Sequence, residues 1–130
     1  MLQSTVNKRK KIDLSSAPWT MHEFFAGSGL VAYGLKGMFA PVWANDISAQ
    51  KATVYKANFG DDHFELDDIK NVKGNDLPFA NLSWASFPCQ DLSLAGAIGG
   101  IHAERSGLVW EWLRVLDEME RSQRSSCWKM

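Results

Sequence analysis

A short apolar run that passes directly into a glycine turn is the feature that most limits what this chain can fold into. Trp19 to Phe25 is β-prone, and Ala26-Gly27-Ser28-Gly29 follows it with no spacer. Apolar or small residues then recur at helical spacing, and Gly37 closes the segment. The recurring positions are Leu30, Gly34, Leu35 and Met38. A strand, a glycine turn and a helix in this order are typical of the first unit of a parallel α/β sheet.

The rest of the chain repeats this alternation of strand and helix. The expected elements are strands at residues 41–46, 64–68 and 82–86 and helices at residues 48–58 and 106–120. The strand at 82–86 has the composition of a buried strand, and Ser48 is placed to cap the first of the two helices. The pattern predicts an α/β fold with a mostly parallel sheet, in which ligands bind at the carboxyl ends of the strands.

The overall charge excludes a protein that binds nucleic acid over its whole surface. The 130 residues are 45% hydrophobic and 22% charged, with a net charge of -1. Nucleic-acid binding of that kind needs clustered Lys and Arg, and Lys8-Arg9-Lys10-Lys11 is the one such cluster. We expect it to belong to a solvated, polar arm at residues 1–18, with contact to phosphates as the alternative. No apolar stretch approaches ~18 residues, so no membrane partner is expected.

Two cysteines, Cys89 and Cys127, do not form a disulfide framework and fit a reducing cytoplasm, with nucleoid association in a prokaryote. Cys89 follows Pro88 at the end of a predicted strand and precedes a glycine-rich loop. A thiolate at such a place can act as a nucleophile, and an inert buried cysteine is the alternative. The three histidines are scattered, so no zinc site is expected.

Acidic residues end two of the predicted strands. Asp46 lies about 20 residues past the glycine turn, where an acid can accept both ribose hydroxyls of an adenosine-containing cofactor; capping the next helix is the alternative. Asp68, in Asp67-Asp68-Ile69, could accept a hydrogen bond from an adenine amino group, or it could belong to a solvated turn. Ala32 stands where the dinucleotide fingerprint needs its third glycine. The pattern favours an adenosine cofactor without choosing one.

A cysteine loop and four further motifs resemble the cytosine-5 DNA methyltransferases, in that family's order. Phe87-Pro88-Cys89-Gln90, followed by Leu92-Ser93-Leu94-Ala95-Gly96, is similar to the catalytic loop of the family. The other motifs are Glu23 to Gly29, with Glu23 where Asp is usual; Asn45-Asp46-Ile47, followed by Asn58-Phe59-Gly60; Asp68-Ile69; and Arg105-Ser106-Gly107-Leu108 before a helix. Together they cover residues 20–117, nearly all of the part expected to fold.

The resemblance implies an incomplete Rossmann-like methyltransferase fold over residues 19–120 that transfers a methyl group from S-adenosylmethionine to C5 of cytosine in DNA. Cys89 would add to C6 of the cytosine, which makes C5 able to attack the methyl group. The target base must leave the duplex for this step. Gln90 and Ser93 would face the DNA, and Pro88 would shape the loop and contact the base.

The same resemblance assigns residues to the cofactor. Phe25 would stack on adenine, and Gly27 and Gly29 would let the backbone approach the methionine part. Asp46 would hold the ribose and Asp68 the adenine amino group. The remaining cofactor-binding residues would be Ile47, Ile69, Pro88 and Leu108.

Two motifs of the family have no counterpart in this sequence. A Glu-Asn-Val string would supply a carboxyl at cytosine N3, and a Gln-x-Arg-x-Arg string an arginine at the base; neither occurs here. Residues 121–130 are polar and match nothing in the family. We expect this atypical tail to result from a frameshift or premature stop, with a genuine short variant as the alternative. The strands that close the sheet would then be missing, and an exposed edge favours self-association.

Three other interpretations remain open at this stage. The chain could be a fragment that binds S-adenosylmethionine and complements a second chain carrying the missing motifs. It could belong to a relative that acts on cytosine in RNA, since a target-recognition region would decide between the two substrates. A nicotinamide oxidoreductase is the generic alternative for a glycine turn with an acid, although Ala32 and the Pro88-Cys89 loop argue against it.

We expect little or no methyl transfer by the 130-residue chain alone, because its sequence lacks the string that would assist at cytosine N3. Losing one such transition-state contact commonly costs ~100-fold or more in rate. A methyl-transfer assay on mixed-sequence DNA measures this. Sustained turnover in that assay would contradict the expectation.

Overall fold

A parallel sheet forms the centre of the computed structural model, which describes residues 10–88 and 107–127. Within these residues four strands pair in the order β3-β2-β1-β4, and every pair is parallel. The strands are β1 (Trp19–Phe24), β2 (Phe39–Asp46), β3 (Phe64–Leu66) and β4 (Leu82–Ala85). The predicted α/β fold with a mostly parallel sheet is confirmed.

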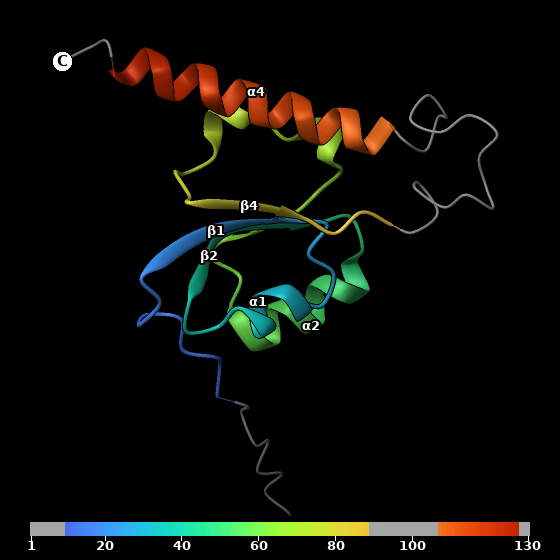
Figure 1. The fold of residues 1–130 in the computed structure, drawn as a ribbon. Helices are drawn as coiled ribbons and strands as arrows, with labels where there is room; N and C mark the ends of the chain where they lie inside the picture. The colour runs from blue at the N-terminus through green and yellow to red at the C-terminus, as the bar shows by residue number, and fades with distance from the viewer. Residues whose placement is uncertain (1–9, 89–106, 128–130) are drawn as a thin grey trace, which may run out of the picture.

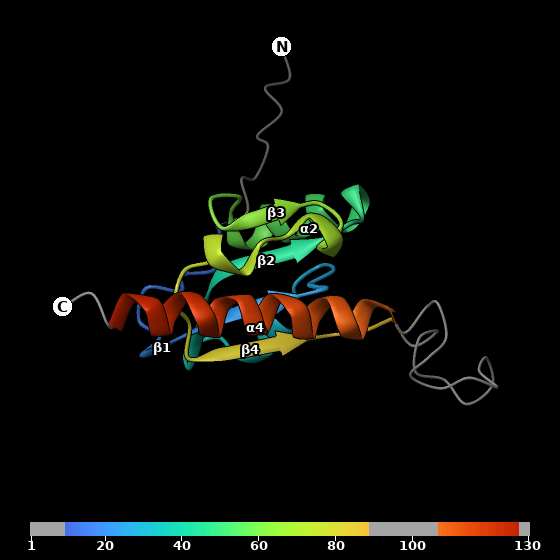
Figure 2. The same cartoon turned by 90° about the horizontal axis from the view of Figure 1, so that it is seen from above.

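Helices cover both faces of the sheet. Figure 1 shows α1 (Leu30–Gly34) and α2 (Ala49–Phe59) on one face and α4 (Gly107–Cys127) on the other. Two single 3₁₀ turns, η1 (Ile69–Asn71) and η2 (Gly74–Asp76), contact α4. From above, α4 runs along the strands and lies over the middle of the sheet (Figure 2). The layers are therefore helix, sheet and helix, which buries β1 on both faces.

Each face of the sheet has its own apolar cluster. Beneath α4 the buried residues are Phe24, Trp43, Ile69, Val72 and Val115. On the side of α1 and α2 they are Ala26, Ala32, Ala44, Tyr55 and Phe59. The predicted cap of α2 is present, because the Ser48 hydroxyl accepts a hydrogen bond from the backbone N–H of Lys51 at 3.3 Å.

Two elements differ from the sequence-based expectation. The first helix ends at Gly34 instead of Gly37. Leu30 and Tyr33 are 78% and 53% exposed, so α1 has no broad apolar face to stabilise further turns. The expectation that β4 is buried was wrong. In the described sheet β4 is an edge strand, and Trp84 is 43% exposed.

The helix after the undescribed segment is longer than expected. We placed its end near Glu120, but α4 continues to Cys127. Ion pairs four residues apart, Arg121 with Asp117 and Arg124 with Glu120, support the added turns. The first residues of the expected tail are thus helical.

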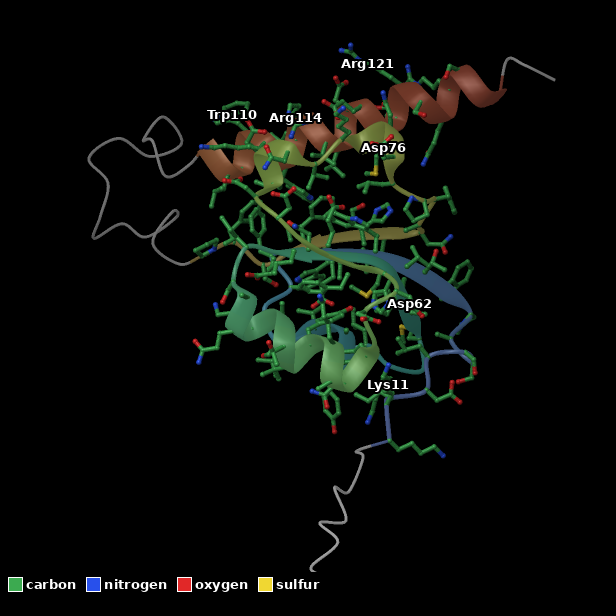
Figure 3. All side chains as sticks on the ribbon, turned by 180° about the vertical axis from the view of Figure 1, so that it is seen from behind. Lys11, Asp62, Asp76, Trp110, Arg114 and Arg121 are labelled. Atoms are coloured by element: carbon green, nitrogen blue, oxygen red, sulfur yellow. The ribbon has the colours of Figure 1, made fainter. Side chains whose placement is uncertain are left out.

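Arg114 fixes α4 above the 3₁₀ turns. Its guanidinium donates to the backbone carbonyls of Ile69 and Val72, each at 3.0 Å, and forms ion pairs with Glu111 and Glu118 at 2.8 Å. Glu118 in turn accepts from the backbone N–H of Gly74 at 2.7 Å. Arg114 is labelled at this contact in Figure 3. The Ile69 carbonyl also accepts the backbone N–H of Val72 at 3.1 Å, so Arg114 adds a second hydrogen bond to the carbonyl that closes η1.

Part of the expected polar arm packs on the domain. Ile12 donates its backbone N–H to the carbonyl of Asn58 at 2.8 Å, and Ile12 and Leu14 pack against the cluster under α1 and α2. Residues 10–14 are therefore attached to the domain by apolar contact, which a purely polar arm would not be. Lys8 and Arg9 lie outside the described residues.

Glu23 is an unusual residue for the middle of a sheet. It is fully buried in β1, and neither carboxylate oxygen has a hydrogen-bond partner in the described part of the chain. Burial raises the pKa of Glu23 to about 7. The backbone N–H of Ala32 lowers this pKa in part, although it is not placed to form a hydrogen bond with the carboxylate. A carboxyl in this setting is more stable in its neutral form.

Gly74→Ala should lower the free energy of unfolding by about 2 kcal/mol or more, because overpacking forces the neighbours apart. The added Cβ would lie 2.2 Å from the Val115 carbonyl oxygen and 2.7 Å from the Glu118 Cβ. Gly34→Ala is the matched control, since the described chain has nothing beyond that helical turn within 4 Å of the added Cβ. Urea unfolding compares the variants. A parent-like midpoint for Gly74→Ala would contradict the docking of α4 on η2.

Glu23→Gln should stabilise the protein more at high pH than at low pH. The folded-state pKa is raised from 4.5 to about 7, so the parent is fully stable below the unfolded value and loses stability as pH rises through this window. The difference between variant and parent should grow by about 3 kcal/mol between about pH 4 and about pH 8. Urea unfolding at both pH values measures it, and the histidines act equally in both proteins. A pH-independent difference would contradict a buried, ionisable Glu23.

Candidate functional site

A cavity of about 330 Å³ lies where the strands end. Its lining comes from the ends of β1, β2 and β4, from the segment after β3, and from the starts of α2 and α4. The lining residues are Phe25, Asn45, Asp46, Ile47, Ser48, Lys51, Asp67, Asp68, Ile69, Ser86, Pro88 and Leu108. The volume is in the range of small-molecule sites, and the position is the usual one for ligands in parallel sheets.

Asp46 is the central acid of this cavity. One carboxylate oxygen accepts the backbone N–H of Gly27 at 2.8 Å, and the other accepts the backbone N–H of Ser48 at 2.8 Å. The residue is 9% exposed. Since each carboxylate oxygen can accept two hydrogen bonds, both oxygens retain a position for a ligand donor.

Phe25 has a strained backbone at the end of β1. Its φ is 55°, in the left-handed region that bulky residues rarely adopt. The ring centroid lies 5.1 Å from that of Phe87, and the ring borders the cavity. Strain of this kind is found at ligand sites, where the surrounding structure holds a side chain in a required place.

The amide of Asn45 positions the acidic segment after β3. It donates to the carbonyls of Glu65 and Asp67, each at 2.9 Å, and Asn45 is 1% exposed. Asp68 then caps η1, because its side chain accepts the backbone N–H of Lys70 at 2.9 Å. The Asp68 carboxyl is thereby brought to the same cavity as Asp46.

The two glycines of the turn have different surroundings. Gly27, with φ 57°, lines a hollow of about 250 Å³ that shares Lys51 and Ser86 with the main cavity. Gly29, with φ 91°, is packed against α2; a Cβ there would lie 2.5 Å from the Phe59 ring and 2.9 Å from the Tyr55 ring. Gly29 lines a separate hollow on the α1–α2 side. Its absent side chain is required by helix packing.

The structure brings most of the predicted cofactor residues together. Seven of the nine line the main cavity: Phe25, Asp46, Ile47, Asp68, Ile69, Pro88 and Leu108. Gly27 lines the adjoining hollow, and Gly29 lines neither. Cys89, Gln90 and Ser93 lie outside the described residues.

Five lining residues were not predicted from the sequence: Asn45, Ser48, Lys51, Asp67 and Ser86. Ser48 was recognised as a helix cap only. Asn45 and Asp67 adjoin predicted acids, and their proximity in sequence is the signal that could have identified them. Lys51 lies in the first turn of α2, three residues after the cap Ser48, so the spacing of the capping hydrogen bond could have placed it at the same edge.

The two described histidines have structural partners. His22 bonds the Ser83 hydroxyl at 2.9 Å and the Pro78 carbonyl at 2.6 Å, and His63 bonds the Tyr55 hydroxyl at 2.8 Å. Burial lowers the pKa of both side chains. Residues 10–88 and 107–127 contain no group of three side chains suited to hold a metal ion. The helices in these ranges also include none with the length and apolarity to cross a membrane.

Comparison with known proteins gives one consistent family. Residues 19–121 match the family described as C-5 cytosine-specific DNA methylase. The type II methyltransferase M.Bsp6I of Bacillus sp. (strain RFL6) is 38% identical over 95 residues, 71% of this chain and 30% of that protein. M2.BsuMI of Bacillus subtilis (strain 168) is 36% identical over 102 residues, 77% of this chain and 25% of that protein.

A solved structure supports the fold. The crystal structure of the S. pombe Dnmt2 methyltransferase aligns with a TM-score of 0.56 and 24% identity, over 79% of this chain and 32% of that chain. The chain thus spans less than a third of the length of these relatives. The family match nonetheless covers most of the 130 residues, from β1 into α4. The chain therefore belongs to the C-5 cytosine-specific DNA methylase family.

Proposed function

We propose that this chain provides the cofactor-binding part of a DNA cytosine-5 methyltransferase that uses S-adenosylmethionine. The observation that carries the proposal is the convergence of predicted cofactor residues on one cavity at the strand ends. These residues come from segments more than 80 positions apart, from Phe25 to Leu108. Folding alone brings them together.

The chemistry of the lining fits an adenosine group. Asp46 and Asp68 offer carboxylate oxygens, which accept hydrogen bonds from ribose hydroxyls and from an adenine amino group. Phe25, Ile47, Ile69 and Leu108 supply apolar walls for a flat ring. Gly27 leaves room for the remainder of the ligand, because its hollow adjoins the cavity.

The reaction would place Pro88 between cofactor and base. Pro88 lines the cavity and immediately precedes Cys89 in the chain, so a base attacked by Cys89 would lie near the cofactor. The bound cofactor supplies an electrophilic methyl group. The Cys89 thiolate would form a bond to C6 of cytosine, and the C5–C6 π electrons would move to C5. C5 would then attack the methyl carbon as the bond from that carbon to the sulfonium sulfur breaks, which leaves S-adenosylhomocysteine. Loss of the C5 proton then releases the thiolate.

DNA is the proposed substrate, in duplex form with the target cytosine flipped out. The support is the family to which residues 19–121 belong and the type II methyltransferases among its relatives. Gln90 and Ser93 are proposed to face the DNA, on the strength of their place in the motif. The alternative proposal is that the chain binds S-adenosylmethionine and complements a second chain that carries the Glu-Asn-Val and Gln-x-Arg-x-Arg strings.

Calorimetric titration of the 130-residue chain with S-adenosylmethionine should give binding that Asp46→Asn weakens by about 10-fold or more, since a charged acceptor for two hydroxyls is lost. Asp62→Asn is the control. It removes an exposed acid from the turn before β3, at the opposite end of the sheet (Figure 3).

Circular dichroism and unfolding midpoints of the three proteins separate binding from folding. A folded parent chain that does not bind S-adenosylmethionine would contradict the proposed function. Equal affinity of the parent and Asp46→Asn would contradict the role of Asp46 while leaving the cofactor assignment intact.

A further inference from the structure

Lys51 lies at the junction of two hollows. It lines the main cavity beside Asp46, and it also lines the hollow of the glycine turn beside Gly27. Ser86 is the other residue that the two linings share. A ligand whose adenosine end occupies the main cavity and whose tail follows the glycine turn would therefore pass Lys51.

The stem of Lys51 is held against the glycine turn. Its Cδ would lie 3.7 Å from a Cβ placed on Gly27, so the aliphatic chain borders the turn at van der Waals distance. The backbone N–H of Lys51 is bound by the Ser48 hydroxyl in the helix cap. The side chain is exposed, and its position on a capped helical turn restricts where the ammonium can reach.

The ammonium of Lys51 has no carboxylate partner in the described part of the chain, where all ion pairs lie within α4. The carboxylate of the neighbouring Asp46 is held by the backbone N–H groups of Gly27 and Ser48 and forms no ion pair with Lys51. The first turn of α2 contains no acidic residue. Three acids line the main cavity, but among the described residues the hollow of the glycine turn is lined by Lys51 and by no acid. The ammonium of Lys51 therefore suits a negatively charged group of a ligand on the side of the glycine turn.

We propose that Lys51 binds the carboxylate of the amino-acid tail of the cofactor and so selects adenosine ligands that carry such a tail. The inference rests on the proposed function, because it presupposes adenosine in the main cavity. It assigns Lys51 a role in specificity that neither the motifs nor the comparisons give it. The interaction is a charge-assisted hydrogen bond between an ammonium and a carboxylate.

The chain offers a matched control on the same helix. Lys56 lies five residues after Lys51 in α2, and its ammonium lies 5.6 Å from the centroid of the Phe64 ring. It lines neither hollow. Lys56→Met therefore removes one positive charge from α2 without touching the proposed carboxylate site.

Two ligands that differ in the tail test the proposal. S-adenosylhomocysteine carries the zwitterionic amino-acid tail, and 5′-methylthioadenosine lacks it. Calorimetry on the 130-residue chain should show that Lys51→Met lowers the affinity for S-adenosylhomocysteine about 5-fold and leaves the affinity for methylthioadenosine unchanged. A loss of this size is expected for one partly exposed ion pair. Lys51→Arg should retain most of the parent's preference for S-adenosylhomocysteine over methylthioadenosine, and Lys56→Met should retain all of it.

The outcomes separate this inference from the function on which it rests. A parent chain that binds neither ligand overturns both. Parent and Lys51→Met with equal affinity for S-adenosylhomocysteine overturn the inference alone. Equal weakening of both ligands in Lys51→Met would also overturn it, since the lysine would then support the adenosine end or the fold. Added salt should lower the affinity for S-adenosylhomocysteine more in the parent than in Lys51→Met, because salt screens the ion pair.

Discussion

The carboxylate of Asp46 is the constraint on which the rest of the site depends. It joins two segments of the chain, because it accepts the N–H of Gly27, 19 residues before it, and the N–H of Ser48, two residues after it. The first bond fixes the turn after β1, and the second fixes the entry to α2. Without this acceptor both N–H groups lose their bonds, at a cost of about 1–3 kcal/mol each where water is excluded. The cavity and the glycine hollow share this one anchor.

The two layers of helices hold the segments around Asp46 in different ways. On one side Tyr55 and Phe59 pack so closely on Gly29 that no side chain fits between α2 and the turn. On the other side Arg114 bonds the carbonyl of Ile69, at the start of η1, and that of Val72, directly after it, and Leu108 brings the start of α4 to the cavity. The strained Phe25 stands where these layers meet. A rigid sheet thus positions side chains from loops, as in many α/β enzymes.

Features set by local interactions were predictable from the sequence. The helix after Asp46 was predicted because Ser48 is a helix cap and because strands and helices alternate along the chain. The partial exposure of β4 was not, since burial depends on which strands lie beside it. The positive φ of Phe25 and the hydrogen bond from the Gly27 N–H to Asp46 depend on tertiary contacts, so no sequence pattern predicts them. Lys51 was missed for a related reason: its importance comes from a junction of two hollows that exists only in the fold.

The most direct measurement is a map of backbone amide chemical shifts in ¹⁵N-labelled chain during titration with S-adenosylmethionine. If the cofactor occupies the cavity at the strand ends, the largest changes will fall on Gly27, Ser48 and Ile69. The amide of Gly74, which is bound by Glu118 on the far side of η1, will change little. Changes centred on Gly74 and α4, or saturation of the ligand with no change at Gly27 and Ser48, would contradict this site.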